Sequence, residues 1–188
     1  MKSKTILLHV CCAPCMIVPL ERLRKQSFQV NGFFYNPNIE PKEELEKRKT
    51  NVLAYSKRND CAMFFDQNEN SEQFFAAFAG KLEGPERCHT CWYFRLKKTA
   101  EHAKKNNADY FTTTLLVSPY QDGEKIREIG EKAAAETGVM FHYENFSTGY
   151  QQAVQISRLE NMYRQKYCGC KLSLAQRQAA KKTRIKPS

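Results

Sequence analysis

Short apolar runs alternate with longer amphipathic stretches along most of this chain. The apolar runs are rich in β-branched and aromatic residues, which is typical of buried strands, and we predict strands at residues 5–10, 30–35, 61–65, 109–117 and 139–143. The stretches between them carry apolar residues at helical spacing. We predict helices at residues 16–26, 41–58, 72–82, 89–107, 122–138, 150–167 and 172–185, with Gly84-Pro85 separating the third from the fourth.

Strand and helix alternate about five times, which predicts an α/β fold. Such alternation is typical of a parallel sheet of about five strands with helices on both faces, in the Rossmann-like manner. The chain has 188 residues and shows no internal repeat or linker. We therefore expect one domain over residues 1–188, with a basic helical segment from about 161 to 188.

The densest chemistry follows the first predicted strand, where Cys11, Cys12 and Cys15 surround the helix-opening Pro14. Ligands in open α/β folds bind at the carboxyl ends of strands. Three thiols at that place favour soft-metal chemistry, and the alternative is that they pack as small apolar side chains. Cys15 lies one turn further on, and the sequence leaves open whether it faces a metal or the helix–sheet interface.

Cys88 and Cys91 form a C-x-x-C pair at the start of a predicted helix, where the helix N-terminus would lower the pKa of a thiol. The pair alone is compatible with zinc, a redox dithiol or an iron–sulfur cluster. Together with Cys11 and Cys12 it completes a four-thiolate set, which both zinc and a [4Fe–4S] cluster accept. Adjacent cysteines are unusual in zinc knuckles, so the set favours a cluster.

Cys168 and Cys170 are separated only by Gly169, so an oxidised pair closes a small, strained ring of the kind found in working disulfides. This spacing favours redox cycling, and the alternatives are free thiols or further metal ligands. Cys61 begins a strand and is predicted to be a core residue. His9 is predicted to be a packed, hydrogen-bonded core histidine, with proton donation as the alternative.

The formal charge is +10, which favours an anionic partner such as nucleic acid. No acidic residue follows Glu160, and eight cations do: Arg164, Lys166, Lys171, Arg177, Lys181, Lys182, Arg184 and Lys186. Tyr163 and Tyr167 lie among them, and cations with aromatic rings are typical of RNA binding. The alternative is a solvated basic tail.

The chain has no P-loop or dinucleotide fingerprint, so no motif indicates ATP or NAD. Its first twenty residues are interrupted by His9, cysteines and prolines and do not form a secretory signal, and no segment is apolar enough to cross a bilayer. We expect a cytoplasmic protein without a membrane partner, in which eight cysteines are ligands or redox groups rather than structural disulfides.

Five stretches together carry a family resemblance: HVCCAPC (9–15), NPNIEPKEELEKR (36–48), ERCHTCWYFRLKKTA (86–100), FTTTLLVSPYQD (111–122) and SRLENMYRQKYCGCKLS (157–173). In this order they resemble the QueH-type epoxyqueuosine reductases over nearly the whole chain. The resemblance implies a HUP-like domain that reduces epoxyqueuosine in tRNA to queuosine, the last step of queuosine biosynthesis, with electrons from an unidentified donor.

The resemblance also implies a site. A [4Fe–4S] cluster would be held by Cys11, Cys12, Cys88 and Cys91, and Cys168 and Cys170 would be the redox-active pair. An additional iron ion is implied near the cluster; the motifs do not assign its ligands, and Cys15 or an acidic residue such as Asp66 is a candidate. Two other functions compete. A tRNA-thiolating enzyme of the PP-loop type would need an SGGxDS-like loop after the first strand, which is absent, and a zinc-stabilised RNA-binding module would be colourless rather than brown.

Overall fold

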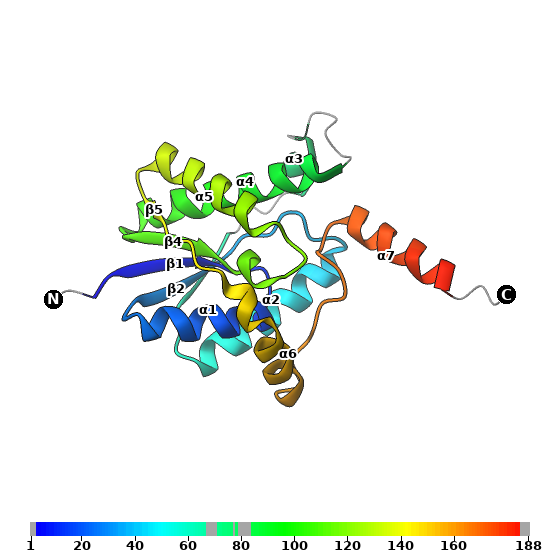
Figure 1. The fold of residues 1–188 in the computed structure, drawn as a ribbon, viewed down its shortest axis with the longest axis horizontal. Helices are drawn as coiled ribbons and strands as arrows, with labels where there is room; N and C mark the ends of the chain where they lie inside the picture. Colours follow the sequence, from blue (N-terminus) through cyan, green and yellow to red (C-terminus); the bar gives the residue numbers. More distant parts are fainter. Residues whose placement is uncertain (1–2, 67–70, 77, 79–83, 185–188) are drawn as a thin grey trace.

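The computed structural model describes residues 3–66, 71–76, 78 and 84–184, and its centre is a five-stranded parallel sheet (Figure 1). The strands lie in the order β3-β2-β1-β4-β5. Their bounds are β1 (Thr5–His9), β2 (Gln29–Phe34), β3 (Met63–Phe65), β4 (Tyr110–Thr113) and β5 (Met140–Phe141). Ile6, Leu7 and Leu8 of the central strand are at most 1% exposed, because helices cover both faces of the sheet. The predicted fold class is confirmed.

Helices α4 and α5 pack on one face of the sheet, and α1 and α2 lie on the other (Figure 1). The helices are α1 (Ala13–Lys25), α2 (Lys42–Arg58), α3 (Ser71–Ala76), α4 (Gly84–Lys105), α5 (Gly123–Thr137), α6 (Tyr150–Leu159) and α7 (Lys171–Arg184), with 3-10 turns η1 (Thr114–Val117) and η2 (Phe146–Gly149). None of the described helices is long and apolar enough to span a bilayer.

The helix predicted over residues 150–167 is wrong in its second half, because α6 ends at Leu159. Asn161 adopts a left-handed conformation with φ +50°, and the N–H of Met162 reaches back to the carbonyl of Ser157 at 2.9 Å. This pattern is a Schellman-type helix end. Residues 161–170 therefore form an irregular segment, so the predicted basic helical region of 161–188 begins as helix only at Lys171.

Other predicted bounds also change. The strand predicted over 109–117 ends at Thr113, whose hydroxyl accepts from the N–H of Leu115 and so caps the 3-10 turn that follows. Gly84-Pro85 opens α4 instead of preceding a helix at residue 89, as a proline in the first turn readily does. The strands predicted over 61–65 and 139–143 are shorter than predicted, and the end of the helix predicted over 72–82 lies outside the described residues.

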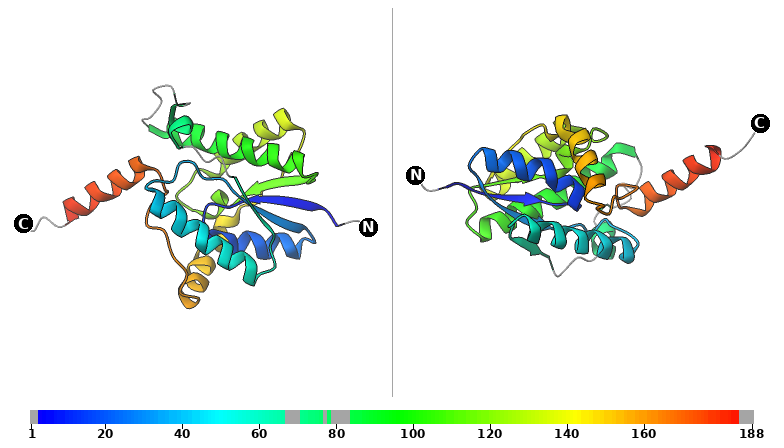
Figure 2. Two further views of the ribbon diagram at one scale, coloured as in Figure 1. Left: turned by 180° about the vertical axis from the view of Figure 1, so that it is seen from behind. Right: turned by 90° about the horizontal axis from the view of Figure 1, so that it is seen from below.

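The direction of strand progression reverses between β1 and β4. From β1 the chain moves outward to β2 and β3, and it then returns to add β4 and β5 on the other side. The carboxyl ends of two neighbouring strands diverge at such a switch point and leave a crevice for ligands. Cys11 and Thr114 follow these two strand ends. Helix α7 points away from the rest of the molecule near this edge (Figures 1 and 2).

Candidate thiol-lined active site

A cavity of about 770 Å³ lies at this carboxyl edge and gathers thiols from three separate parts of the chain. The β1–α1 turn, helix α4 and the segment between α6 and α7 each contribute, and the thiols on the cavity wall are Cys11, Cys15, Cys88, Cys168 and Cys170. Cys12 contacts Cys11, and Cys91 lines a smaller adjoining cavity. Seven of the eight cysteines thus lie in one region.

Cys11, Cys12 and Cys15 form the tightest group. Within the described ranges they are the one set of three ligand-type side chains whose donor atoms all lie within 4.8 Å of one another. Hydrogen bonds with Cys12 and Cys15 lower the pKa of Cys11 well below its ordinary value, whereas burial raises the pKa of Cys12. The structure therefore places Cys15 with the other two thiols, which the sequence had left open.

Two polar side chains complete this group, and sequence reasoning did not identify either of them. The hydroxyl of Thr114 accepts from the backbone N–H of Cys11 at 3.0 Å and lies 3.3 Å from its Sγ. Gln165 donates its side-chain N–H to Cys12 Sγ at 2.9 Å. The threonine run at the end of the fourth predicted strand could have indicated Thr114 as a site residue. Gln165 had none, because it comes from a segment predicted to be helix.

Cys88 and Cys91 lie in the second turn of α4 and face the Cys168–Cys170 pair. These four thiols line a second, small cavity together with aromatic side chains. Because α4 begins at Gly84, neither cysteine lies at the helix N-terminus, and the influence of the helix dipole falls off beyond the first turn. Burial instead raises the pKa of Cys91, so the lowered thiol pKa predicted from helix position is wrong there.

Cys168 is exposed and Cys170 is buried, so the two thiols of this pair differ in environment. A hydrogen bond from Cys168 lowers the pKa of Cys170 to about 5. The backbone N–H of Ser173 also lies 3.4 Å from Cys170 Sγ. At neutral pH Cys170 is therefore a thiolate, the reactive form of a cysteine, and Cys168 is the more accessible partner.

Arg95 of α4 brings a buried positive charge between the two thiol groups. The residue is 2% exposed; one guanidinium nitrogen donates to Asn36 Oδ1 at 2.6 Å and another lies 3.9 Å from Cys91 Sγ. Its Nε has no partner among the described residues. A buried cation needs compensating negative charge, and thiolates are the groups within its reach.

His9, Cys61 and Asp66 lie outside the reactive part of the site. His9 donates from Nε2 to the carbonyl of Tyr35 and accepts at Nδ1 from Thr113; burial lowers its pKa to about 3, so it is the packed, neutral histidine that the sequence favours. Cys61 is buried against the carbonyl of Val30, as predicted. Asp66 pairs with Lys98 at 3.4 Å and lines neither thiol cavity.

Comparison with known proteins identifies the family. The model of the family "Epoxyqueuosine reductase QueH" matches residues 6–176. The chain belongs to the QueH family. It is 37% identical over 180 residues to an epoxyqueuosine reductase QueH of Thermotoga maritima, with 92% of each chain covered. The QueH protein of Haemophilus influenzae is 33% identical over 175 residues, covering 90% of this chain and 71% of the relative.

Two solved structures share the fold of this QueH family member. One is a U34-tRNA thiolase NcsA from Methanococcus maripaludis with its [4Fe-4S] cluster, at a TM-score of 0.58 and 10% identity, covering 88% of this chain and 60% of the thiolase. The other is a predicted subunit of a tRNA methyltransferase from Methanocaldococcus jannaschii, at a TM-score of 0.54 and 8% identity, covering 82% and 74%. At these identities the likeness concerns the α/β fold alone.

The donor set of the QueH site fits an iron–sulfur cluster. Thiolates are the ligands that such clusters prefer, and ligands of a multi-metal cluster are spaced more widely than those of a single ion. Among the described residues no carboxylate lines the main cavity, whereas Arg95 and Arg48 bring positive charge to it. Asn38, 1% exposed, has no hydrogen-bond partner for its amide among the described residues and faces the adjoining cavity. A negatively charged, sulfur-rich group would satisfy these cations and donors.

Proposed function

We propose that this protein reduces the epoxide of epoxyqueuosine in tRNA to give queuosine, the last step of queuosine biosynthesis. The observation that carries the proposal is the meeting of all three cysteine motifs at one cavity with a cationic rim. In this proposal residues 1–188 act as one α/β domain in the cytoplasm, and an unidentified donor restores the electrons that each turnover consumes.

We assign Cys11, Cys12, Cys88 and Cys91 as the ligands of a [4Fe–4S] cluster and Cys168 with Cys170 as the redox pair. The first four come from the end of β1 and from α4, on either side of the buried Arg95. Cys15 lies within the same tight thiol group as Cys11 and is the candidate ligand of an additional iron ion. Asp66, the other candidate, lines neither thiol cavity and pairs with Lys98 instead.

Reduction of the epoxide to an alkene consumes two electrons and two protons, and its oxygen leaves as water. When bound, a [4Fe–4S] cluster supplies electrons one at a time, and an additional iron supplies Lewis acidity. As their Sγ atoms join, Cys168 and Cys170 release two electrons and the one proton of the Cys168 thiol, and the second proton comes from solvent, which balances the reduction. The thiolate of Cys170 is ready for this step at neutral pH, because its pKa is about 5. The donor then returns the disulfide to the dithiol.

The rim of the main cavity suits a single-stranded stretch of RNA. Four cations lie on it: Arg87, Arg164, Lys166 and Arg177. Tyr120 also lines the cavity, is 85% exposed, and meets Tyr150 edge to face at 6.1 Å. Phosphates would bind the cations, and a base could stack on the exposed ring. Lys171 does not lie on this rim, because its ammonium sits over the ring of Phe75 at 5.5 Å.

The test is anaerobic preparation with iron and sulfide analysis, followed by assay on tRNA that carries epoxyqueuosine. Conversion is measured by nucleoside mass spectrometry as the loss of one oxygen atom from the modified base. We expect a brown protein that converts the base, and Cys88→Ser to lose both iron and conversion, with Cys61→Ser as the matched control that loses neither. A colourless wild-type protein that binds tRNA without converting the base would overturn the proposal in favour of a zinc-stabilised RNA-binding module.

A further inference from the structure

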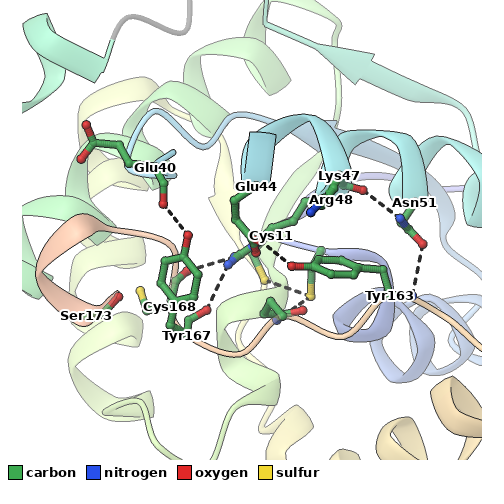
Figure 3. Close-up of polar contacts among 12 residues, drawn as sticks. Cys11, Glu40, Glu44, Lys47, Arg48, Asn51, Tyr163, Tyr167, Cys168 and Ser173 are labelled. Carbon is green, nitrogen blue, oxygen red and sulfur yellow. Dashed lines mark hydrogen bonds and ion pairs between the residues drawn. The ribbon is translucent and has the colours of Figure 1, made fainter. Parts of the chain in front are cut away.

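The segment of residues 161–170, which carries the Cys168–Cys170 pair, is held along helix α2 by side chains of that helix (Figure 3). At its beginning, the backbone N–H of Tyr163 donates to Asn51 Oδ1 at 3.2 Å. Near its end, two consecutive carbonyls turn toward Arg48. The position of the cysteine pair is thus set by a helix more than one hundred residues earlier in the chain.

Arg48 makes the central contact. Its Nη1 donates to the carbonyl of Cys168 and its Nη2 to the carbonyl of Tyr167, each at 3.0 Å, and the guanidinium lies 5.5 Å from the ring centroid of Tyr167. The side chain is 1% exposed, so these charge-assisted hydrogen bonds form out of water, where they are strong. A planar fork with two carbonyl partners fixes both the place and the orientation of the turn at Cys168.

Glu44 orients this guanidinium. Its Oε1 accepts from Arg48 Nε at 2.8 Å, and its Oε2 accepts from the hydroxyl of Tyr163 in the anchored segment. The carboxylate is one helical turn from Arg48 and is itself buried. Glu44 thus fixes Arg48 through its Nε, which leaves Nη1 and Nη2 to donate to the two carbonyls.

Gly169 packs closely against Arg48 and against Ile39, which precedes α2. It has φ +131°, and a Cβ there would lie 2.8 Å from Ile39 and 3.4 Å from Arg48 Nη1. The backbone N–H of Glu40 donates to the carbonyl of Gly169 at 2.8 Å. Three consecutive carbonyls, from Tyr167 to Gly169, are thus bonded to groups outside the segment, and the turn between the two cysteines has one defined conformation.

We propose that Arg48, oriented by Glu44, is the positioning residue that holds Cys168 and Cys170 in the geometry from which their disulfide closes. The inference rests on the proposed redox role of the pair. On closure the Sγ–Sγ bond forms, the two sulfurs give two electrons to the epoxide, the Cys168 thiol gives one proton, and solvent gives the second proton with which the epoxide oxygen leaves as water. A turn already bonded through its carbonyls keeps the two thiols at high effective concentration. Without Arg48 the turn must be ordered as the disulfide forms, and the disulfide becomes easier to reduce.

The experiment measures the dithiol–disulfide equilibrium of this pair alone. Trypsin cuts after Lys166 and Lys171 and releases residues 167–171, which contain Cys168 and Cys170 and no other cysteine. Cluster-loaded protein is equilibrated anaerobically in dithiol–disulfide buffers, quenched in acid, alkylated and digested. The mass of the peptide then reports the oxidised fraction. For Arg48→Met, which loses both carbonyl bonds, we expect an equilibrium constant for closure lower by about tenfold, which corresponds to about 30 mV for two electrons.

Three further variants separate positioning from general stability. Lys47→Met removes the adjacent exposed cation of α2, and Asn51→Ala frees the far end of the segment; both should stay within about twofold of wild type. Arg48→Lys keeps the charge but not the fork, so it should fold and still show a lowered constant. If Arg48→Met does not fold, the constant measured for Arg48→Lys is the test of the inference.

Each outcome has one meaning. Wild-type constants in folded Arg48→Met and in Arg48→Lys would overturn the inference, as would an equal shift in Asn51→Ala. A wild-type peptide that never becomes oxidised in any buffer would instead refute the redox role of the pair, and with it that part of the proposed function, irrespective of Arg48.

Discussion

The cationic rim of the thiol cavity makes a quantitative prediction about tRNA binding. Arg164, Lys166 and Arg177 all line the cavity, and Arg177 also donates to the backbone carbonyl of Lys166, so the three cations belong to one surface. The perturbation is the triple substitution of these residues by Gln. It removes three positive charges and leaves every cysteine in place.

The magnitude follows from counterion release. Each phosphate contact to a single strand contributes about −0.7 to the slope of log affinity against log salt, so three lost contacts should flatten the slope by about 2. Between roughly 50 and 200 mM salt, wild-type affinity should therefore fall about twentyfold more than that of the triple variant. At low salt the variant should bind tRNA more weakly than wild type, and at high salt the affinities of the two proteins should converge.

The assay is fluorescence anisotropy of labelled tRNA over this salt range, with cluster-loaded protein. The matched control replaces three cations by Gln at the far ends of α2 and α4: Lys57, Lys104 and Lys105. The control should keep the wild-type slope, because these residues are not on the rim. Equal slopes in the rim variant and in wild type would refute the reasoning and would mean that the basic end is only a solvated tail.

Three further predictions concern the buried part of the site. Cys168→Ser/Cys170→Ser should keep its iron and lose multiple turnover; an iron-poor double variant, measured by metal analysis, would make these cysteines ligands instead. Since the pKa of Cys170 is lowered to about 5, its thiolate persists from neutral pH down to that value and is lost as pH falls through it. In a Cys168→Ala protein the hydrogen bond that stabilises this thiolate is lost, so the pH midpoint of Cys170 alkylation should rise. Arg95→Met should lower the reduction potential of the bound cluster, measured by anaerobic spectroelectrochemistry, because a buried cation favours the more negative reduced state. An unchanged potential would contradict this, and the control is Arg127→Met, which removes an exposed cation of α5 that lines neither thiol cavity.

The sequence by itself determined the fold class and the chemistry of the site. Strand and helix periodicity depend on which local positions are apolar, and β1, β2 and α2 lie close to their predicted bounds for that reason. The spacing within each cysteine motif is likewise local, so pairs such as Cys88 and Cys91 could be recognised as potential ligands. The environment of an isolated residue could be inferred too, as the buried Cys61 shows.

Tertiary structure alone decided how these parts combine. Cys15 joins Cys11 and Cys12 because α1 begins at Ala13, and the Cys168 turn reaches the cavity because Asn161 ends α6 early and Arg48 binds the carbonyls that follow. These contacts join residues far apart in the chain, and no local pattern encodes them. In the sequence, Arg48 is one of many cations on a charged helix. Only the docking of a distant segment buries its side chain and provides the two carbonyls to which its guanidinium donates.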